Sequence, residues 1–380
     1  MAVLIWLWAS VLFVQWLLTG NRSVVPWHEW QVKKERCPRR TIKQFLLSLL
    51  CCGFATFLAP GLLEASEAPS LDLGGFFFGD LYHVPSHHTA EGDDASGLVL
   101  RRLLLSADGK FSDGWSGKTK IEAYHEGAFE NYEMTHRVLD FGLTRKLGRH
   151  QVSGGLIPTI TYDVMEAFWG KRYLVRTAPD IQGIAARDVG LKVMGPLSLA
   201  DGLSYRIMYG SKATWQADKN PFDKAMGGIT WRGPTGVLID AYVDWESQPG
   251  PYDRSTAQFL LGKKTERYTL GFEYTNQDRG EDPDLELATV MGVVKLGGAW
   301  SAMAQLHRLL KPSVKGNDIA YIPFDPTAKA TNLVAGFEYR FNNHLVLSPN
   351  IVWTHYSVNE SGVKPDDDVH LRLTFYVNFE

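Results

Sequence analysis

Charged side chains that could act together are concentrated in one long connection, residues 156–187. This segment lies between two stretches with strand periodicity and has no regular apolar spacing of its own. Connections of this length inside a fold are usually functional, as binding loops or lids are. Its mixed charges could bind or sort ions, and the candidates are Asp163, Glu166, Lys171, Arg172 and Arg176.

Other polar groups give weaker signals. Residues 117–119, Gly-Lys-Thr, match the end of a phosphate-binding loop, but Ser112 stands where the leading glycine is required. The context is also turn-to-strand, whereas that motif joins a strand to a helix. The histidines at 87–88 and aspartates at 93–94 could bind a metal ion, yet their spacing fits no metal-binding pattern. We interpret them as a solvated loop.

The same holds for the acidic run 366–368, which could bind divalent cations but is more simply an acidic loop. His125, His136 and His307 have no activated serine near them in the sequence pattern. A hydrolytic enzyme would need such a pair, or two carboxylates brought together. We therefore predict that the protein is not an enzyme, with no catalytic residue, no metal site and no cofactor.

Composition fits two classes of β-protein and does not decide between them. The 380 residues include 36 glycines, 12% are aromatic, and mean hydropathy is −0.15. Outside the N-terminus no apolar run approaches the ~20 residues of a membrane helix. These features suit a transmembrane β-barrel, whose strands are apolar on one face only, and equally a large soluble β-sandwich.

Charge and cysteine usage point to an exported protein that binds no nucleic acid. Residues 1–68 hold seven of the 39 basic and four of the 42 acidic residues, so the remainder has 32 basic and 38 acidic residues. This part of the chain is therefore net acidic, whereas a nucleic-acid-binding protein shows an excess of basic residues. All three cysteines lie within the first 52 residues, and a cysteine-free mature chain suits an oxidising compartment.

The N-terminus has two apolar runs, residues 2–18 and 45–63. The second follows a basic stretch and precedes small residues, the order of a secretory signal. We predict a signal peptide over 32–68, read from an alternative start codon at Val32 and cleaved after Ala65 or Ala68. Residues 1–31 would then be an extension that arises from a mis-assigned start; the alternative is an inner-membrane anchor.

From residue 69 onward the chain alternates apolar and polar residues. Clear examples are 332–341, 237–245 and 369–379, and successive strand side chains point to opposite faces. Short turns are predicted at 107–115, 146–151, 195–202, 232–236, 263–267, 296–300 and 341–345. Long loops are predicted at about 83–97, 126–135, 158–187, 211–224, 246–256, 276–286, 309–331 and 357–368.

This series predicts an all-β fold, a transmembrane antiparallel β-barrel of about sixteen strands over 69–380. Short turns would face the periplasm and long loops the exterior. Residues 286–296 and the fifth strand show no clear face, so fourteen or eighteen strands remain open. Aromatic residues at strand ends, as in two interfacial girdles, favour the barrel over the sandwich: Trp115, Tyr205, Tyr209, Trp245, Tyr268, Tyr274, Trp300, Tyr339, Phe341, Trp353 and Phe379.

Three segments carry a family resemblance: the hairpin 98–126 with its paired arginines and Gly-Trp turn, the strand 187–195, and the aromatic-terminated strand 371–379. In these the chain resembles the phosphate-selective porin O and P family. That resemblance implies passive diffusion of small hydrophilic solutes, a homotrimer, and a place in the outer membrane of a diderm bacterium, among lipids and lipopolysaccharide. The chain departs from the pattern at Glu380, which follows the terminal aromatic, and has no regular ladder of arginines.

In such a barrel we expect segment 158–187 to fold inward and narrow the lumen. Alternation assigns these residues to the inner wall: Arg102, Lys118, Lys120, Glu122, Tyr124, Glu126, Asp140, Lys192, Arg206, Asp240, Asp244, Glu273, Glu338, Arg340 and Arg372. A basic wall facing acidic loop residues would create a transverse field, since fixed charges bias which ions enter. Alternatively, these charges pair with strand neighbours and only keep the lumen wet.

The predicted constriction combines Asp163, Glu166, Lys171, Arg172 and Arg176 of the loop with wall residues Arg102, Lys118, Lys120, Glu122, Arg340 and Arg372. We expect a diffusion porin, with a substrate-selective phosphate or anion porin as the alternative. An outer-membrane enzyme and a structural barrel plugged by its loops are the hypotheses of another class.

Overall fold

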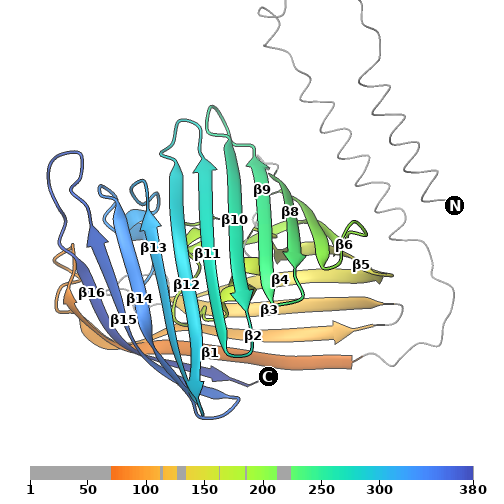
Figure 1. Cartoon of the computed structure of the whole chain (residues 1–380), viewed down its shortest axis with the longest axis horizontal. Helices are drawn as coiled ribbons and strands as arrows, with labels where there is room; N and C mark the ends of the chain where they lie inside the picture. The colour runs from red at the N-terminus through yellow and green to blue at the C-terminus, as the bar shows by residue number, and fades with distance from the viewer. Residues whose placement is uncertain are drawn as a thin grey trace, which may run out of the picture. The chain divides into compact units, whose positions relative to one another are not determined.

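Sixteen antiparallel strands form one closed β-barrel in the computed structural model (Figure 1). Each strand pairs with its neighbours in the chain, and β1 closes the barrel by pairing with β16. Closure leaves no strand with an unpaired edge, which is what a membrane-spanning sheet requires. The structure describes residues 70–111, 114–125, 134–161, 163–184, 186–211 and 224–379.

The predicted strand count of sixteen and the alternation of short turns with long loops are confirmed. The strands are β1 (Ser70–Ser86), β2 (Ser96–Lys110), β3 (Trp115–His125), β4 (Met134–Leu147), β5 (His150–Pro158), β6 (Arg187–Pro196), β7 (Leu203–Gly210), β8 (Lys224–Arg232), β9 (Val237–Glu246), β10 (Arg254–Lys264), β11 (Tyr268–Asp278), β12 (Leu285–Gly297), β13 (Trp300–Leu309), β14 (Ala330–Arg340), β15 (Leu345–Tyr356) and β16 (Asp368–Asn378). Short helical segments lie in two long loops: α3 (Asp163–Trp169), α4 (Ala178–Ile181) and η2 (Gly316–Asp318).

The two faces of the barrel wall differ as the alternation predicts. On β9 the outward Val243 is 61% exposed, whereas its inward neighbours Tyr242 and Asp244 are buried. Exposed aromatic side chains lie near both ends of the strands, for example Trp245 at the loop end of β9 and Trp300 at the turn end of β13. An apolar outer face bordered by aromatic residues fits a barrel that is embedded in lipid.

Among the residues described, no helix is long and apolar enough to cross a membrane. The predicted N-terminal extension (1–31) and signal peptide (32–68) lie outside the described residues, as does the predicted inward residue Glu126.

Strand β12 shows why the sequence of 286–296 had no clear face. Its inward residues Leu285, Leu287 and Met291 are fully buried, and outward Val290 is 48% exposed. Both faces are therefore apolar, because the inner one is covered by protein instead of water. An alternation of apolar with polar residues is lost wherever a strand is buried on both sides.

Replacing Val290 with arginine tests the direction of the β12 face. Val290 pairs in register with outward Phe272 and Leu306 at mid-strand, and an arginine facing lipid at that depth costs about 2–4 kcal/mol of folding free energy. Denaturant titration of the protein folded in lipid vesicles measures this cost. As the control, Val363→Arg in the loop 357–367, where Val363 is 58% exposed, should leave the midpoint in place; equal effects of the two changes would contradict this register.

Candidate functional site

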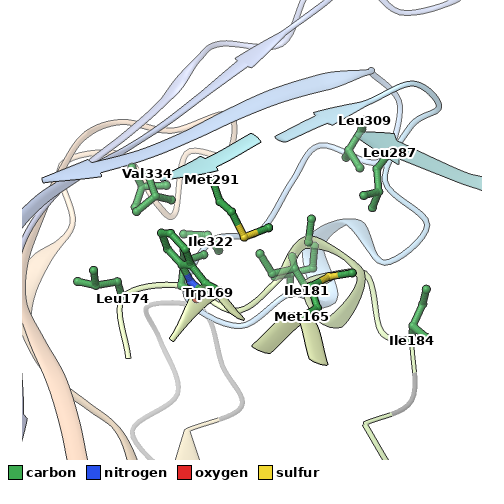
Figure 2. Close-up of a cluster of buried hydrophobic side chains, with 14 of the residues drawn as sticks. Met165, Trp169, Leu174, Ile181, Ile184, Leu287, Met291, Leu309, Ile322 and Val334 are labelled. Atoms are coloured by element: carbon green, nitrogen blue, oxygen red, sulfur yellow. Dashed lines mark hydrogen bonds between the residues drawn. The ribbon is translucent and has the colours of Figure 1, made fainter. Parts of the chain in front are cut away.

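The loop between β5 and β6, residues 159–186, packs on inward-facing side chains of the barrel wall. Its buried apolar residues form one cluster with inward residues of β12, β13, β14 and β15; Figure 2 shows part of this cluster. On the loop these are Val164, Met165, Phe168, Trp169, Leu174, Val175, Ile181 and Ile184. On the wall they include Leu285, Leu287, Met291, Met303, Leu309, Val334, Val346 and Val352.

The backbone of this loop is shaped by the short helices α3 and α4 and by Gly170. The carboxylate of Asp163 accepts a hydrogen bond from the Val164 amide at 2.8 Å as α3 begins. The helix ends at Gly170, which has a φ of +66°, a conformation that glycine adopts without steric cost. The indole N–H of Trp169 then donates to the Val175 carbonyl at 3.0 Å, so the chain turns back over the helix.

Two wall glycines leave the space that Phe168 fills. Gly262 of β10 and Gly271 of β11 are directly paired across the strands, and both stand at buried, inward positions of the alternating pattern. A Cβ atom at either position would overlap the Phe168 ring. Glycine inside a strand often marks such a close approach by another part of the structure.

A buried polar cluster fixes the middle of the loop to β1, β2 and β16. Arg101 contacts Asp80, with Nε to Oδ2 at 2.9 Å, and donates to the carbonyls of Tyr173 and Leu174, the latter at 3.2 Å. Arg372 also donates to the Leu174 carbonyl, at 3.3 Å, and lies 3.9 Å from Asp80. Arg372 was predicted to line the constriction, but it is buried and holds the loop in place.

Of this cluster, only Arg372 was assigned to the inner wall from the sequence; Asp80 was not singled out, and Arg101 departs from the alternation. The pairing of β1 with β2 shifts between Phe78 and Gly79, which oppose Arg102 and Leu100, so Arg101 is the extra residue of a β-bulge. A bulge breaks the period of two and re-aims a side chain. As a result both Arg101 and Arg102 reach groups inside the barrel.

Within the loop, one guanidinium holds two carboxylates. Nη1 of Arg172 lies 2.7 Å from Oε1 of Glu166 and 2.5 Å from Oδ2 of Asp180, and Arg176 lies 3.9 Å from Asp180. Burial raises the pKa of Glu166, although Arg172 opposes this shift. Burial also acts on Asp180, but Arg172 and Arg176 outweigh it and lower the pKa of that carboxyl. Glu166 is therefore the first of the two to gain a proton as pH falls.

Lys171 is drawn away from the other loop charges and pairs with the wall. Its ammonium group contacts Glu338 of β14, which also accepts a hydrogen bond from the hydroxyl of Tyr173. Arg340 contacts the other Glu338 oxygen at 3.2 Å. Of the predicted constriction residues, Lys171 and Arg340 are thus brought together around one wall carboxylate.

On the wall of β2, β3 and β4 the predicted charges pair with their strand neighbours. Glu122 contacts both Arg102 and Arg137, the latter at 2.6 Å. Lys120 lies 3.6 Å from Asp140. Lys118 pairs with Asp108 at 2.8 Å and is half-exposed near the turn, so the three residues share a strand face but lie at different heights. Such cross-strand pairs are a common stabilising unit of sheets.

A second loop, residues 310–329 between β13 and β14, also packs on the inward apolar cluster of the barrel, which was not expected from the sequence. Its residues Ile319, Ile322 and Phe324 are buried in the same apolar cluster. The hydroxyl oxygen of Tyr321 lies 2.8 Å from the Arg101 carbonyl oxygen and 2.5 Å from that of His125, and its single proton is shared between them. The available signal was the apolar run 319–324, which is unusual in a solvated loop.

Two cavities flank the inserted loop. One of about 490 Å³ is lined by Arg101, Arg102, Arg137, Arg172, Arg176 and Lys315, by the carboxylates Glu122 and Asp318, and by Phe78, Tyr124, His125, Asn317, Ala320 and Tyr321. The other, of about 570 Å³, is lined on its charged side by Lys146, Arg149, Arg206, Arg232 and Asp163. Among the described residues, basic side chains outnumber carboxylates in both linings.

The comparisons with known proteins place this geometry in a structural class. No family model matches the sequence, and no curated protein matches it. Among solved structures, the in-vitro folded trimer form of OmpT from Vibrio cholerae matches with a TM-score of 0.56 and 14% identity, over 82% of this chain and 100% of that chain.

Salmonella typhi OmpF in complex with daunomycin matches with a TM-score of 0.56 and 15% identity, over 80% of this chain and 97% of that chain. A mutant of Rh. blastica porin matches with a TM-score of 0.51 and 14% identity, over 82% and 100%. At these identities the likeness establishes the fold, a sixteen-stranded porin-type barrel. The resemblance to the phosphate-selective porin O and P family stays a prediction.

Replacing Phe168 with alanine tests whether wall packing holds the loop. Removing a buried phenylalanine ring costs about 3–5 kcal/mol of folding free energy. In this loop the change removes the contact of the ring with Gly262 and Gly271. We expect a higher and noisier single-channel current, because the loop leaves the wall more often. Phe341→Ala, at an outward position that is 54% exposed, is the matched control; identical traces for the two variants would refute the packing role.

Proposed function

We propose that this protein is an outer-membrane porin through which small hydrophilic solutes diffuse passively, with a preference for anions over cations. The proposal is supported by the porin-type barrel, its apolar outer face and a loop packed on one side of the lumen. The observation that carries the anion preference is the excess of basic residues in both cavities beside that loop.

The balance of charged residues around the smaller cavity supports a modest preference for anions over cations. Among described residues, six basic and two acidic side chains line the smaller cavity. Three carboxylates outside that lining, Asp80, Glu166 and Asp180, pair with its arginines. Guanidinium groups therefore face the cavity while much of the compensating charge lies behind them. Such an arrangement favours anions near the cavity surface without a large net charge.

A phosphate- or anion-selective porin is the second candidate. Five of the six basic residues in the smaller cavity are arginines, and the planar guanidinium group binds phosphate in a bidentate manner. Currents measured in chloride with added inorganic phosphate separate the two functions. Block of the chloride current by phosphate would support the selective porin, whereas additive currents would support a general diffusion pore.

We further propose that the barrel lies in the outer membrane, in contact with lipid and lipopolysaccharide, and assembles as a homotrimer. One of the similar structures is described as a trimer form, and the outward apolar residues of this chain would face lipid or a neighbouring copy. The proposed function involves no catalytic step and no cofactor.

Neutralising two cavity arginines tests the charge preference. Arg137 and Arg176 line the smaller cavity and are less buried than Arg101. In R137Q/R176Q the lining loses two positive charges, so the reversal potential in a salt gradient across a planar bilayer should move toward the cation value. Lys110→Glu, at an exposed position outside both linings, should leave the potential unchanged; a shift of equal size there would rule out the cavity as its source.

As pH is lowered, the preference for anions should begin to rise above the usual titration range of a glutamate, because burial raises the pKa of the Glu166 carboxyl. Arg172 then keeps only Asp180 as its anionic partner, and the loop becomes more positive. Reversal potentials recorded as pH is lowered test the effect. Glu166→Gln should remove most of the pH response, whereas Glu360→Gln in the loop 357–367 should retain it; a full response in E166Q would exclude Glu166 as the titrating group.

A further inference from the structure

Two histidines and an aspartate meet where the first and last strands close the barrel. His87 and His88 directly follow β1, and Asp368 is the first residue of β16, which pairs with β1. One possible ligand atom from each residue lies within 4.8 Å of the other two. His87 and Asp368 are 6% and 1% exposed, so the cluster is buried, and the solvated loop expected for His87 and His88 is wrong.

The contacts of His88 orient its ring toward the carboxylate. Its Nε2 lies 3.1 Å from Oδ1 of Asn317, and its Nδ1 lies 2.9 and 3.1 Å from the two oxygens of Asp368. If Nε2–H donates to Asn317, a neutral ring turns the lone pair of Nδ1 toward the carboxylate oxygens. A cation must then stand between Nδ1 and Asp368, either a second proton on the ring or a metal ion.

Other polar groups contact the cluster. Nδ1 of His87 accepts a hydrogen bond from the Thr89 backbone amide at 3.0 Å and also lies 3.0 Å from the Thr89 hydroxyl. The neutral ring therefore carries its proton on Nε2, and His87 becomes a ligand when its ring turns so that Nδ1 leaves Thr89. The Tyr356 hydroxyl donates to Oδ2 of Asp368 at 2.5 Å and lies 3.4 Å from Nδ1 of His88. The ring of His370 lies 5.8 Å from that of His87.

We propose that His87, His88 and Asp368 bind a divalent transition-metal ion, and that Zn²⁺ fits them best. Two imidazole nitrogens and one carboxylate oxygen are a ligand set that zinc uses, with water in the fourth position. Bonds of about 2.0–2.2 Å place tetrahedral ligand atoms about 3.3–3.6 Å apart. The His88–Asp368 pair is already near that separation, and rotation of the His87 ring away from Thr89 would complete the site.

The site would act on the structure in two places. It joins the loop after β1 to the start of β16, and so reinforces the seam at which the barrel closes. It also reaches loop 310–329 through Asn317, which lines the smaller cavity. A bound ion would therefore stabilise both barrel closure and the loop that covers the cavity.

Zinc titration of the full chain, folded in detergent without a polyhistidine tag and stripped with EDTA, tests the proposal. We expect one Zn²⁺ per chain by calorimetry and elemental analysis, and a thermal midpoint that rises with zinc. The double variant His87→Ala/His88→Ala should bind at least tenfold more weakly and lose the rise. His136→Ala, at an exposed histidine, should behave as the wild type.

A measurement on the unmodified chain keeps the test independent of how the variants fold. Cobalt added to the stripped wild-type protein should give the strong visible absorption of a tetrahedral N/O site, and zinc should displace it. Absence of stoichiometric binding, or a cobalt spectrum typical of a hexa-aquo ion, would overturn the proposal. So would unchanged zinc affinity in a folded His87→Ala/His88→Ala variant.

Discussion

The apolar contact between loop 159–186 and the inner wall of β12–β15 is the interaction on which the arrangement of the lumen depends. A barrel interior of this kind is expected to be polar, yet here Leu285, Leu287 and Met291 face inward and are fully buried. Burial of each such side chain contributes about 1.5–3 kcal/mol, whereas the ion pairs around the loop are buried and their desolvation cost offsets much of their attraction. Apolar packing therefore decides where the loop lies, and the ion pairs adjust its position.

This one-sided packing divides the interior into two different surfaces. The wall of β12–β15 is covered by the loop, while the wall of β2–β4 keeps its charged residues beside a cavity. The Asp80–Arg101–Arg372 cluster holds the loop by its carbonyl groups, which fixes the main chain without using the loop's charged side chains. Arg172 and Arg176 therefore stay at the cavity, where their positive charges contribute to the proposed preference for anions.

Much of the fold could be predicted from sequence because its signal is local. Alternation, turn residues and loop length depend on neighbours in the chain, and they located all sixteen strands. Residues 286–296 showed no clear polar face, and this absence was informative. A strand that is apolar on both sides must be covered by protein on its inner face. The same argument applies to the apolar run 319–324 in the second inserted loop.

Features that arise from pairing between distant segments could not be predicted in this way. The bulge that turns Arg101 inward depends on the register of β1 with β2, and Arg372 becomes a loop anchor only because the Leu174 carbonyl lies beside it. His87 and His88 are separated from Asp368 by almost the whole barrel sequence and meet only through closure of β1 on β16. The predicted transverse field depended on unpaired charges, and the structure instead pairs Glu166 and Asp180 within the loop.

The most direct test of this account is the single-channel conductance of a chain in which residues 163–184 are replaced by a short Gly-Ser linker. If the loop occupies the lumen against the β12–β15 wall, the shortened protein should conduct several-fold more current, with far-UV circular dichroism still showing an intact barrel. The equivalent shortening of the loop 357–367 should leave conductance near the wild-type value. An intact barrel whose conductance is unchanged by removal of residues 163–184 would contradict the account.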